Sequence, residues 1–130
     1  MALPSRKFKP RKAIKKRTKP RRVKAIKCRP HLDWVVEEFD CAIKSRVCKV
    51  TRLMHFCAGP IDPDHIRTRG AGGGDEQVWP LCRCAHDLRG TIGIDEIQRR
   101  YSVDAKEMAA HLWSISPPGR VYRYKVSRES

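Results

Sequence analysis

The spacing of apolar residues predicts three helices in the body of the chain. In residues 32–43 the apolar positions recur every three or four residues, and acidic residues occupy other parts of the helical wheel. Residues 94–101 show a shorter pattern of the same kind. A third helix is expected to begin at a Ser102 cap, with acidic residues in its first turn, and to end near Ile115, before a Ser-Pro-Pro-Gly sequence.

Shorter patterns in the middle of the chain predict two strands, a loop and a helix. Residues 64–68 and residues 78–81 each favour a short strand. Residues 70–74 contain four glycines, which favour an open loop between the two strands. A helix is predicted from near Cys82 to about Gly90. The predicted order is therefore strand, loop, strand, helix.

Two further stretches are apolar without a helical period. Residues 47–56 are rich in β-branched side chains and predict a strand of imperfect alternation, followed by a turn at Pro60 and Pro63. In residues 121–126 tyrosine and valine alternate with basic residues, which suits either an edge strand or a basic extension. With the helices, these patterns predict a small α+β domain over residues 31–130, of which residues 94–115 form the C-terminal helices.

Charge separates this domain from the start of the chain. Residues 1–30 contain fourteen of the 29 basic residues and no acidic residue. Such a block repels itself, so we predict a disordered arm that binds nucleic acid through the phosphates. A solvated tail or a localisation signal is the alternative. The basic residues assigned to nucleic-acid contact are Lys12, Lys15, Lys16, Arg17, Arg21 and Arg22 in the arm and Arg67, Arg69 and Arg83 in the body.

The six cysteines point to a metal rather than to disulfides. The sequence shows no signal peptide and no apolar stretch of transmembrane length, so we expect a cytoplasmic protein with reduced thiols and no membrane partner. A body of about 100 residues buries a modest core and would gain from a structural zinc ion. The alternative is that several cysteines are buried small hydrophobes. The candidate zinc ligands are Cys41, Cys57, Cys82 and either Cys84 or Cys48.

Three residues around the glycine-rich loop have the chemistry of phosphodiester hydrolysis. Asp64 and His86 are ligand types for Mg²⁺ or another divalent metal ion, and Mg²⁺ tolerates a site with few protein ligands. The imidazole of His65 can accept a proton near neutral pH. A regular strand would place Asp64 and His65 on opposite faces, so their joint action requires a kink.

Several segments of the chain match those of a known family. Residues 57–67 and 80–83 are similar to the segments that enter the strand and the helix of small phage nucleases, and residues 31–35 and 41–43 are similar to the lead-in of phage recombination-enhancement nucleases. The chain thus resembles the HNH, or ββα-metal, nuclease family over about residues 31–101.

The resemblance implies a DNA endonuclease or nickase with its core at about residues 57–90. Asp64 and His86 would bind one divalent metal ion, and His65 would be the general base. Gln77 stands in the place of the family's central asparagine, which orients that base through the loop backbone. The resemblance further implies a recombinase or another phage protein as a candidate partner, and the cytoplasm of a bacterial host.

Two other hypotheses remain open. Many family members have a structural-zinc histidine at the position of Ala85. Many also have a further histidine at the position of Gly90, so the catalytic metal here would have two protein ligands. This favours, as the second hypothesis, a basic nucleic-acid-binding or assembly protein on an inactive HNH-like zinc scaffold. A ribosome-associated zinc protein is the third hypothesis, and it explains the basic arm but not the Asp64-His65 pair.

Overall fold

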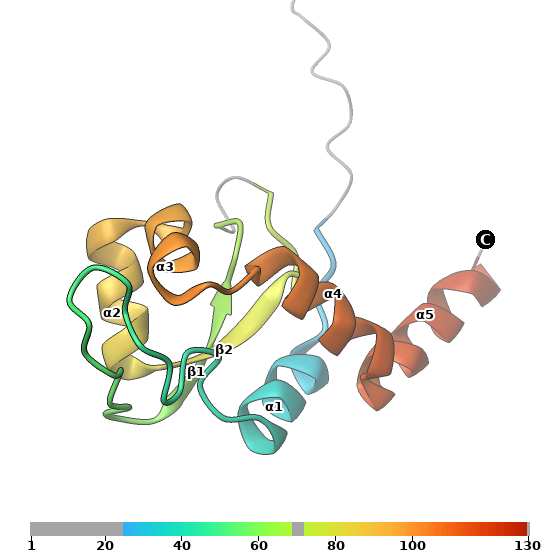
Figure 1. Ribbon diagram of the computed structural model, residues 1–130. Helices are drawn as coiled ribbons and strands as arrows, with labels where there is room; N and C mark the ends of the chain where they lie inside the picture. Colours follow the sequence, from blue (N-terminus) through green and yellow to red (C-terminus); the bar gives the residue numbers. More distant parts are fainter. Residues whose placement is uncertain (1–24, 69–71, 130) are drawn as a thin grey trace, which may run out of the picture.

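The computed structural model describes residues 25–68 and 72–129 and shows a small α+β fold, in which helices surround a two-stranded antiparallel hairpin (Figure 1). The predictions for the basic arm up to residue 24, and for Arg69, lie outside the described residues. The elements are α1 (Arg29–Glu38), β1 (Ile61–His65), β2 (Val78–Cys82), α2 (Arg83–Ile92), α3 (Ile94–Tyr101), α4 (Ala105–Ile115) and α5 (Pro117–Glu129).

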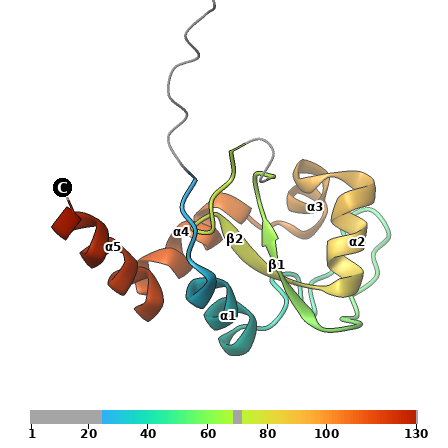
Figure 2. The same ribbon diagram turned by 180° about the vertical axis from the view of Figure 1, so that it is seen from behind.

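The hairpin is enclosed on both faces. Strand β1 pairs with β2 so that Asp64 lies opposite Trp79 and His65 lies opposite Val78. Helices α2 and α3 lie on one side of the hairpin and α1 and α4 on the other, as both views show (Figures 1 and 2). All five residues of β2 are buried, as expected for a strand covered on both faces.

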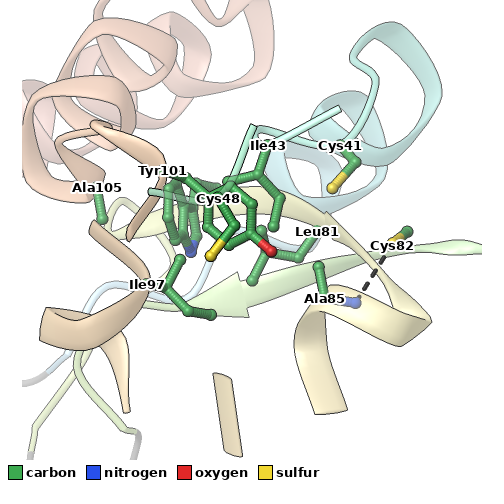
Figure 3. Close-up of a cluster of buried hydrophobic side chains, with 10 residues drawn as sticks. Cys41, Ile43, Cys48, Leu81, Cys82, Ala85, Ile97, Tyr101 and Ala105 are labelled. Carbon is green, nitrogen blue, oxygen red and sulfur yellow. Dashed lines mark hydrogen bonds between the residues drawn. The ribbon is translucent and has the colours of Figure 1, made fainter. Parts of the chain in front are cut away.

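The larger core lies between the hairpin, α2, α3 and the segment that joins α1 to β1. Figure 3 shows Ile43 and Cys48 of that segment against Leu81 of β2 and Ile97 and Tyr101 of α3. Burial of each isoleucine or leucine side chain in this core contributes about 1.5–3 kcal/mol to the free energy of unfolding. A smaller cluster on the other face of the hairpin consists of Leu32, Val35, Val78 and Leu112.

Helix α1 begins earlier and ends earlier than the predicted residues 32–43. Its first turn contains Pro30, and its cap Phe39 is already extended. The chain then leaves the helical path because the amide of Ala42 donates a hydrogen bond to the carbonyl of Pro80. This long-range contact overrides the apolar periodicity and brings Cys41 beside the end of β2.

The predicted strand over residues 47–56 does not form. These residues make an isolated bridge between Val47 and Met54, and Arg52 has a positive φ of 60°. The tail over residues 121–126 is likewise not a strand but the middle of α5. Packing outweighs the alternation of apolar and basic side chains here, because the ring of Tyr122 and the guanidinium of Arg123 both lie against Trp113.

Two boundaries also differ from the sequence-based expectation. Strand β1 begins at Ile61 and contains Pro63, which was predicted to lie in a turn. Proline is tolerated there because β1 pairs with one neighbour and leaves its other edge open. The cap of α4 is Asp104, whose carboxylate accepts a hydrogen bond from the amide of Glu107, whereas Ser102 ends α3 with a positive φ of 53°. Among the described residues, no helix has the length and apolar character to span a membrane.

His31 is a fully buried imidazole at the junction of α1 with α5. Its ring lies edge-on to Trp113 at 4.8 Å, and its Nδ1 is 2.7 Å from the hydroxyl of Ser116. Its Nε2 has no hydrogen-bond partner within the described part of the chain. Burial lowers the pKa of His31 to about 4, although the nearby Asp75 opposes this shift. His31 is therefore neutral at pH 7.

The neutral His31 predicts a loss of stability in acid. Its pKa in the folded state lies below its ordinary value, so the unfolded chain binds more protons between the two values. The contribution of the neutral His31 to the free energy of unfolding is complete above about pH 6.5 and is lost as the pH falls toward 4. Between pH 7 and pH 4.5 this costs about 2–3 kcal/mol of the free energy of unfolding.

Urea unfolding at the two pH values tests this prediction. We expect His31→Phe to lose less stability on acidification than the wild type, whereas a variant of the exposed His111, His111→Gln, should follow the wild type. Equal losses in wild type and His31→Phe would contradict the prediction.

Candidate functional site

Three cysteines and one histidine converge at the start of α2. The sulfur atoms of Cys41, Cys57 and Cys82 and a ring nitrogen of His55 all lie within 4.8 Å of one another. Cys41, His55 and Cys82 are buried, and Cys57 is exposed. Ligand atoms around a tetrahedral zinc ion are about 3.6–3.8 Å apart, so the cluster could hold a metal such as zinc.

Two of the three thiols in this cluster resist ionisation in its present surroundings. Burial raises the pKa of Cys41, and burial together with the neighbouring Cys41 raises the pKa of Cys57 to about 12. Burial opposes ionisation of Cys82 too, but hydrogen bonds from the backbone of Ala85 and Ala58 lower its pKa (Figure 3). Three thiolates therefore form together only when a metal ion compensates their charge.

His55 is the member of this cluster that sequence reasoning missed. The structure brings together the predicted Cys41, Cys57 and Cys82, but the fourth position belongs to His55 rather than to Cys84 or Cys48. Cys84 is exposed on α2, and Cys48 is buried beside Tyr101 in the core (Figure 3). Burial lowers the pKa of His55 and keeps it in the neutral form that binds metal.

A second group of polar residues lies between β1 and α2. Asp64 is 2% exposed, and its Oδ2 accepts a hydrogen bond of 2.8 Å from the indole of Trp79, directly opposite on β2. The guanidinium of Arg89 is 3.4 Å from the same oxygen. The other oxygen, Oδ1, faces Nε2 of His86 at 3.3 Å. The structure thus brings together the two residues predicted to bind a divalent cation.

Asp62 holds the other side of the His86 ring, a contact that the sequence reasoning did not identify. Its Oδ2 is 3.2 Å from Nδ1 of His86, and it also forms an ion pair with Arg83. A carboxylate can only accept, so each ring nitrogen of His86 needs a hydrogen or a cation between it and the carboxylate oxygen that it faces. The Asp-x-Asp spacing could have revealed this contact, because alternate residues of a strand share one face.

His65 lies on the opposite face of β1 from Asp64. Its Nε2 is 2.9 Å from Oδ1 of Asp75, and its side chain borders a surface hollow together with Leu32 and Pro63. Pairing with β2 is continuous through Asp64 and His65, so the expected kink between these two residues is absent from β1. The predicted metal ligand and the predicted base are neighbours in sequence but do not face one site in this conformation.

Asp75 also joins His65 to the root of the basic arm. Its other oxygen accepts a hydrogen bond of 2.7 Å from the amide of Cys28, and its own amide donates to the carbonyl of Ile26. Asp75 is 7% exposed. The candidate base is therefore fixed to residues 26–28, which lie at the end of the predicted nucleic-acid-binding arm.

The remaining predicted site residues lie around this centre. The side chain of Gln77 is exposed, but its main-chain carbonyl accepts a hydrogen bond from the amide of Ile66, the residue after His65. Arg67 is exposed, and Arg83 is exposed apart from its ion pair with Asp62. Gln77 thus contacts the loop backbone beside the candidate base through its main chain.

Comparisons with protein-family models, with curated proteins and with solved structures find no match to this chain.

Proposed function

We propose that this chain is a metal-dependent DNA endonuclease or nickase of the HNH, ββα-metal type, which hydrolyses phosphodiester bonds with one divalent metal ion. The observation that carries the proposal is the approach of Asp64 Oδ1 to His86 Nε2 at 3.3 Å. Two acceptors at this distance require a proton or a cation between them. A cation is the choice that would serve phosphodiester hydrolysis, and the basic residues 1–30 make DNA the expected substrate.

The distance between the two atoms suits a small hard cation. Adjacent ligands of an octahedral ion at about 2.1 Å are about 3 Å apart, close to the observed separation. Two protein ligands leave the other positions to water and phosphate, which Mg²⁺ accepts readily. A bound ion would supply stabilisation of the negative charge that develops on the phosphate and on the leaving oxygen.

The chain's own residues divide the other tasks. Asp62 fixes the ring of His86 with Nε2 toward Asp64, and Arg89 fixes the end of β1 by donating to the carbonyls of His65 and Ile66. His65 would accept the proton of the attacking water, with Asp75 holding its imidazole. The proposal requires the end of β1 to turn when DNA binds, so that His65 reaches the side of Asp64.

A second candidate function draws on the same geometry. Asp64 is nearly inaccessible and already contacts Trp79 and Arg89, and His65 lies on the other face of the strand. If Nε2 of His86 carries a proton, the group becomes a closed ion-pair network with no place for a metal. The chain would then be a nucleic-acid-binding protein on a zinc scaffold.

Cleavage of a supercoiled plasmid separates the two functions. The zinc-loaded full chain should nick or linearise the plasmid when Mg²⁺ or Mn²⁺ is added and should leave it intact without either ion. Retention of the plasmid in a gel-shift experiment measures binding in parallel. Intact DNA binding with no cleavage in either metal would reject the nuclease and support the binding protein.

A further inference from the structure

The segment between α1 and β1 contains a repeat of basic and apolar residues. No acidic residue occurs from residue 41 to residue 61. Within that stretch a basic residue followed by an apolar one recurs every third position, in the pairs Arg46-Val47, Lys49-Val50 and Arg52-Leu53. We call residues 46–56 the basic turn.

The apolar members of the basic turn are exposed to solvent. Val50 is 54% exposed, Leu53 is 69% exposed and Phe56 is 77% exposed. Exposed apolar side chains gathered in one short segment indicate a binding surface. The exposed basic residues between them exclude a purely apolar partner and favour one that carries negative charge.

The basic turn is held by backbone hydrogen bonds, although most of its side chains are exposed. The amide of Cys48 donates to the carbonyl of Leu53, and the amide of His55 donates to the carbonyl of Arg46. The amide of Lys49 donates to the carbonyl of Arg100, so the turn lies beside the end of α3 (Figures 1 and 2). Its last residues lead into the metal cluster through His55 and Cys57.

We propose that the basic turn binds single-stranded DNA, with Lys49 and Arg52 on phosphates and Phe56 stacked on a base. This inference rests on DNA as the ligand in the proposed function and adds the form of DNA. A single strand offers alternating phosphates and exposed base faces, which matches alternating basic and apolar side chains. A duplex hides its base faces and would leave Val50, Leu53 and Phe56 in water.

Binding of fluorescent oligonucleotides tests the inference. The zinc-loaded full chain carries His65→Ala in every sample, so that no DNA is cut, and about 0.2 M salt limits the contribution of the arm. We expect Phe56→Ser to weaken binding of a single strand about tenfold and binding of the matching duplex less than about twofold. The double variant Lys49→Gln/Arg52→Gln should reduce the slope of log affinity against log salt by about 1.4 on the single strand.

Tyr124→Ser provides the matched control, because Tyr124 is an aromatic residue of similar exposure, 61%, on α5. The inference would be overturned if Phe56→Ser lost no affinity for the single strand, or if it lost affinity for single strand and duplex equally. An equal loss of affinity in Tyr124→Ser would overturn it too. Binding to phosphatidylserine vesicles that Phe56→Ser abolishes, with unchanged DNA binding, would also overturn it and assign the turn to a membrane surface. If Phe56→Ser behaves as expected but the wild type cleaves no plasmid, the nuclease proposal fails alone.

Discussion

Replacing Cys57 with serine should remove the bound zinc and lower the free energy of unfolding by on the order of 4 kcal/mol. Cys57 is one of four residues whose ligand atoms lie within 4.8 Å of one another. Serine supplies no thiolate, and three ligands hold zinc far less tightly than four. A zinc ion at this cluster would join the segment after α1 to the start of α2, so its loss should also loosen the core around Ile43 and Cys48.

Cys84→Ser provides the control for this prediction. Cys84 is also an exposed cysteine, but it lies outside the cluster. We expect the wild type and Cys84→Ser to contain about one zinc ion per chain, and Cys57→Ser to contain almost none, by elemental analysis after dialysis. Loss of zinc from Cys84→Ser with retention in Cys57→Ser would show that the cluster is assigned to the wrong residues.

Substitution of the two neighbours on β1 should abolish cleavage in different ways. His65→Ala should reduce the cleavage rate by roughly 10²–10⁴-fold, as removal of a general base does, while Mn²⁺ binding is retained. Asp64→Asn should reduce the rate by at least about 10²-fold and should weaken Mn²⁺ binding too, because the amide oxygen carries no charge. Asparagine still accepts the hydrogen bond from Trp79, so the fold around β2 should be preserved.

Plasmid cleavage and Mn²⁺ titration, followed on the same zinc-loaded samples, measure both effects. Lys125→Gln on α5 is a control that should match the wild type in both. Undiminished cleavage by His65→Ala would exclude this residue as the base. Wild-type cleavage by Asp64→Asn would show that the reaction takes place at another site.

The elements that depend on residues close together in the sequence were predictable from the sequence. The apolar runs on either side of the glycines correctly predicted two strands followed by a helix, and residues 94–101 form α3 as expected. Residues 39–60 were not predictable, because a hydrogen bond from Ala42 to Pro80 and the ligand cluster determine their path. The tail formed α5 because packing on Trp113 outweighed the alternation of its side chains.

The candidate site, too, was predictable in part and in part depends on contacts between distant segments. Asp64 and His86 are close because one residue lies on a strand and the other on the helix that packs against it, as the resemblance to HNH nucleases implied. His55 was missed because zinc ligands that come from distant segments leave no regular spacing. The separation of His65 from Asp64 could be expected from strand alternation, but the partner Asp75 follows only from the folded path of the loop.

A crystal of the zinc-loaded chain soaked in Mn²⁺ tests the central claim most directly. Anomalous diffraction distinguishes the two metals and locates each one. The nuclease proposal predicts a Mn²⁺ peak between Oδ1 of Asp64 and Nε2 of His86, separate from zinc at Cys41, His55, Cys57 and Cys82. A zinc peak at the cysteines, with no Mn²⁺ between Asp64 and His86 at saturating concentration, would contradict it.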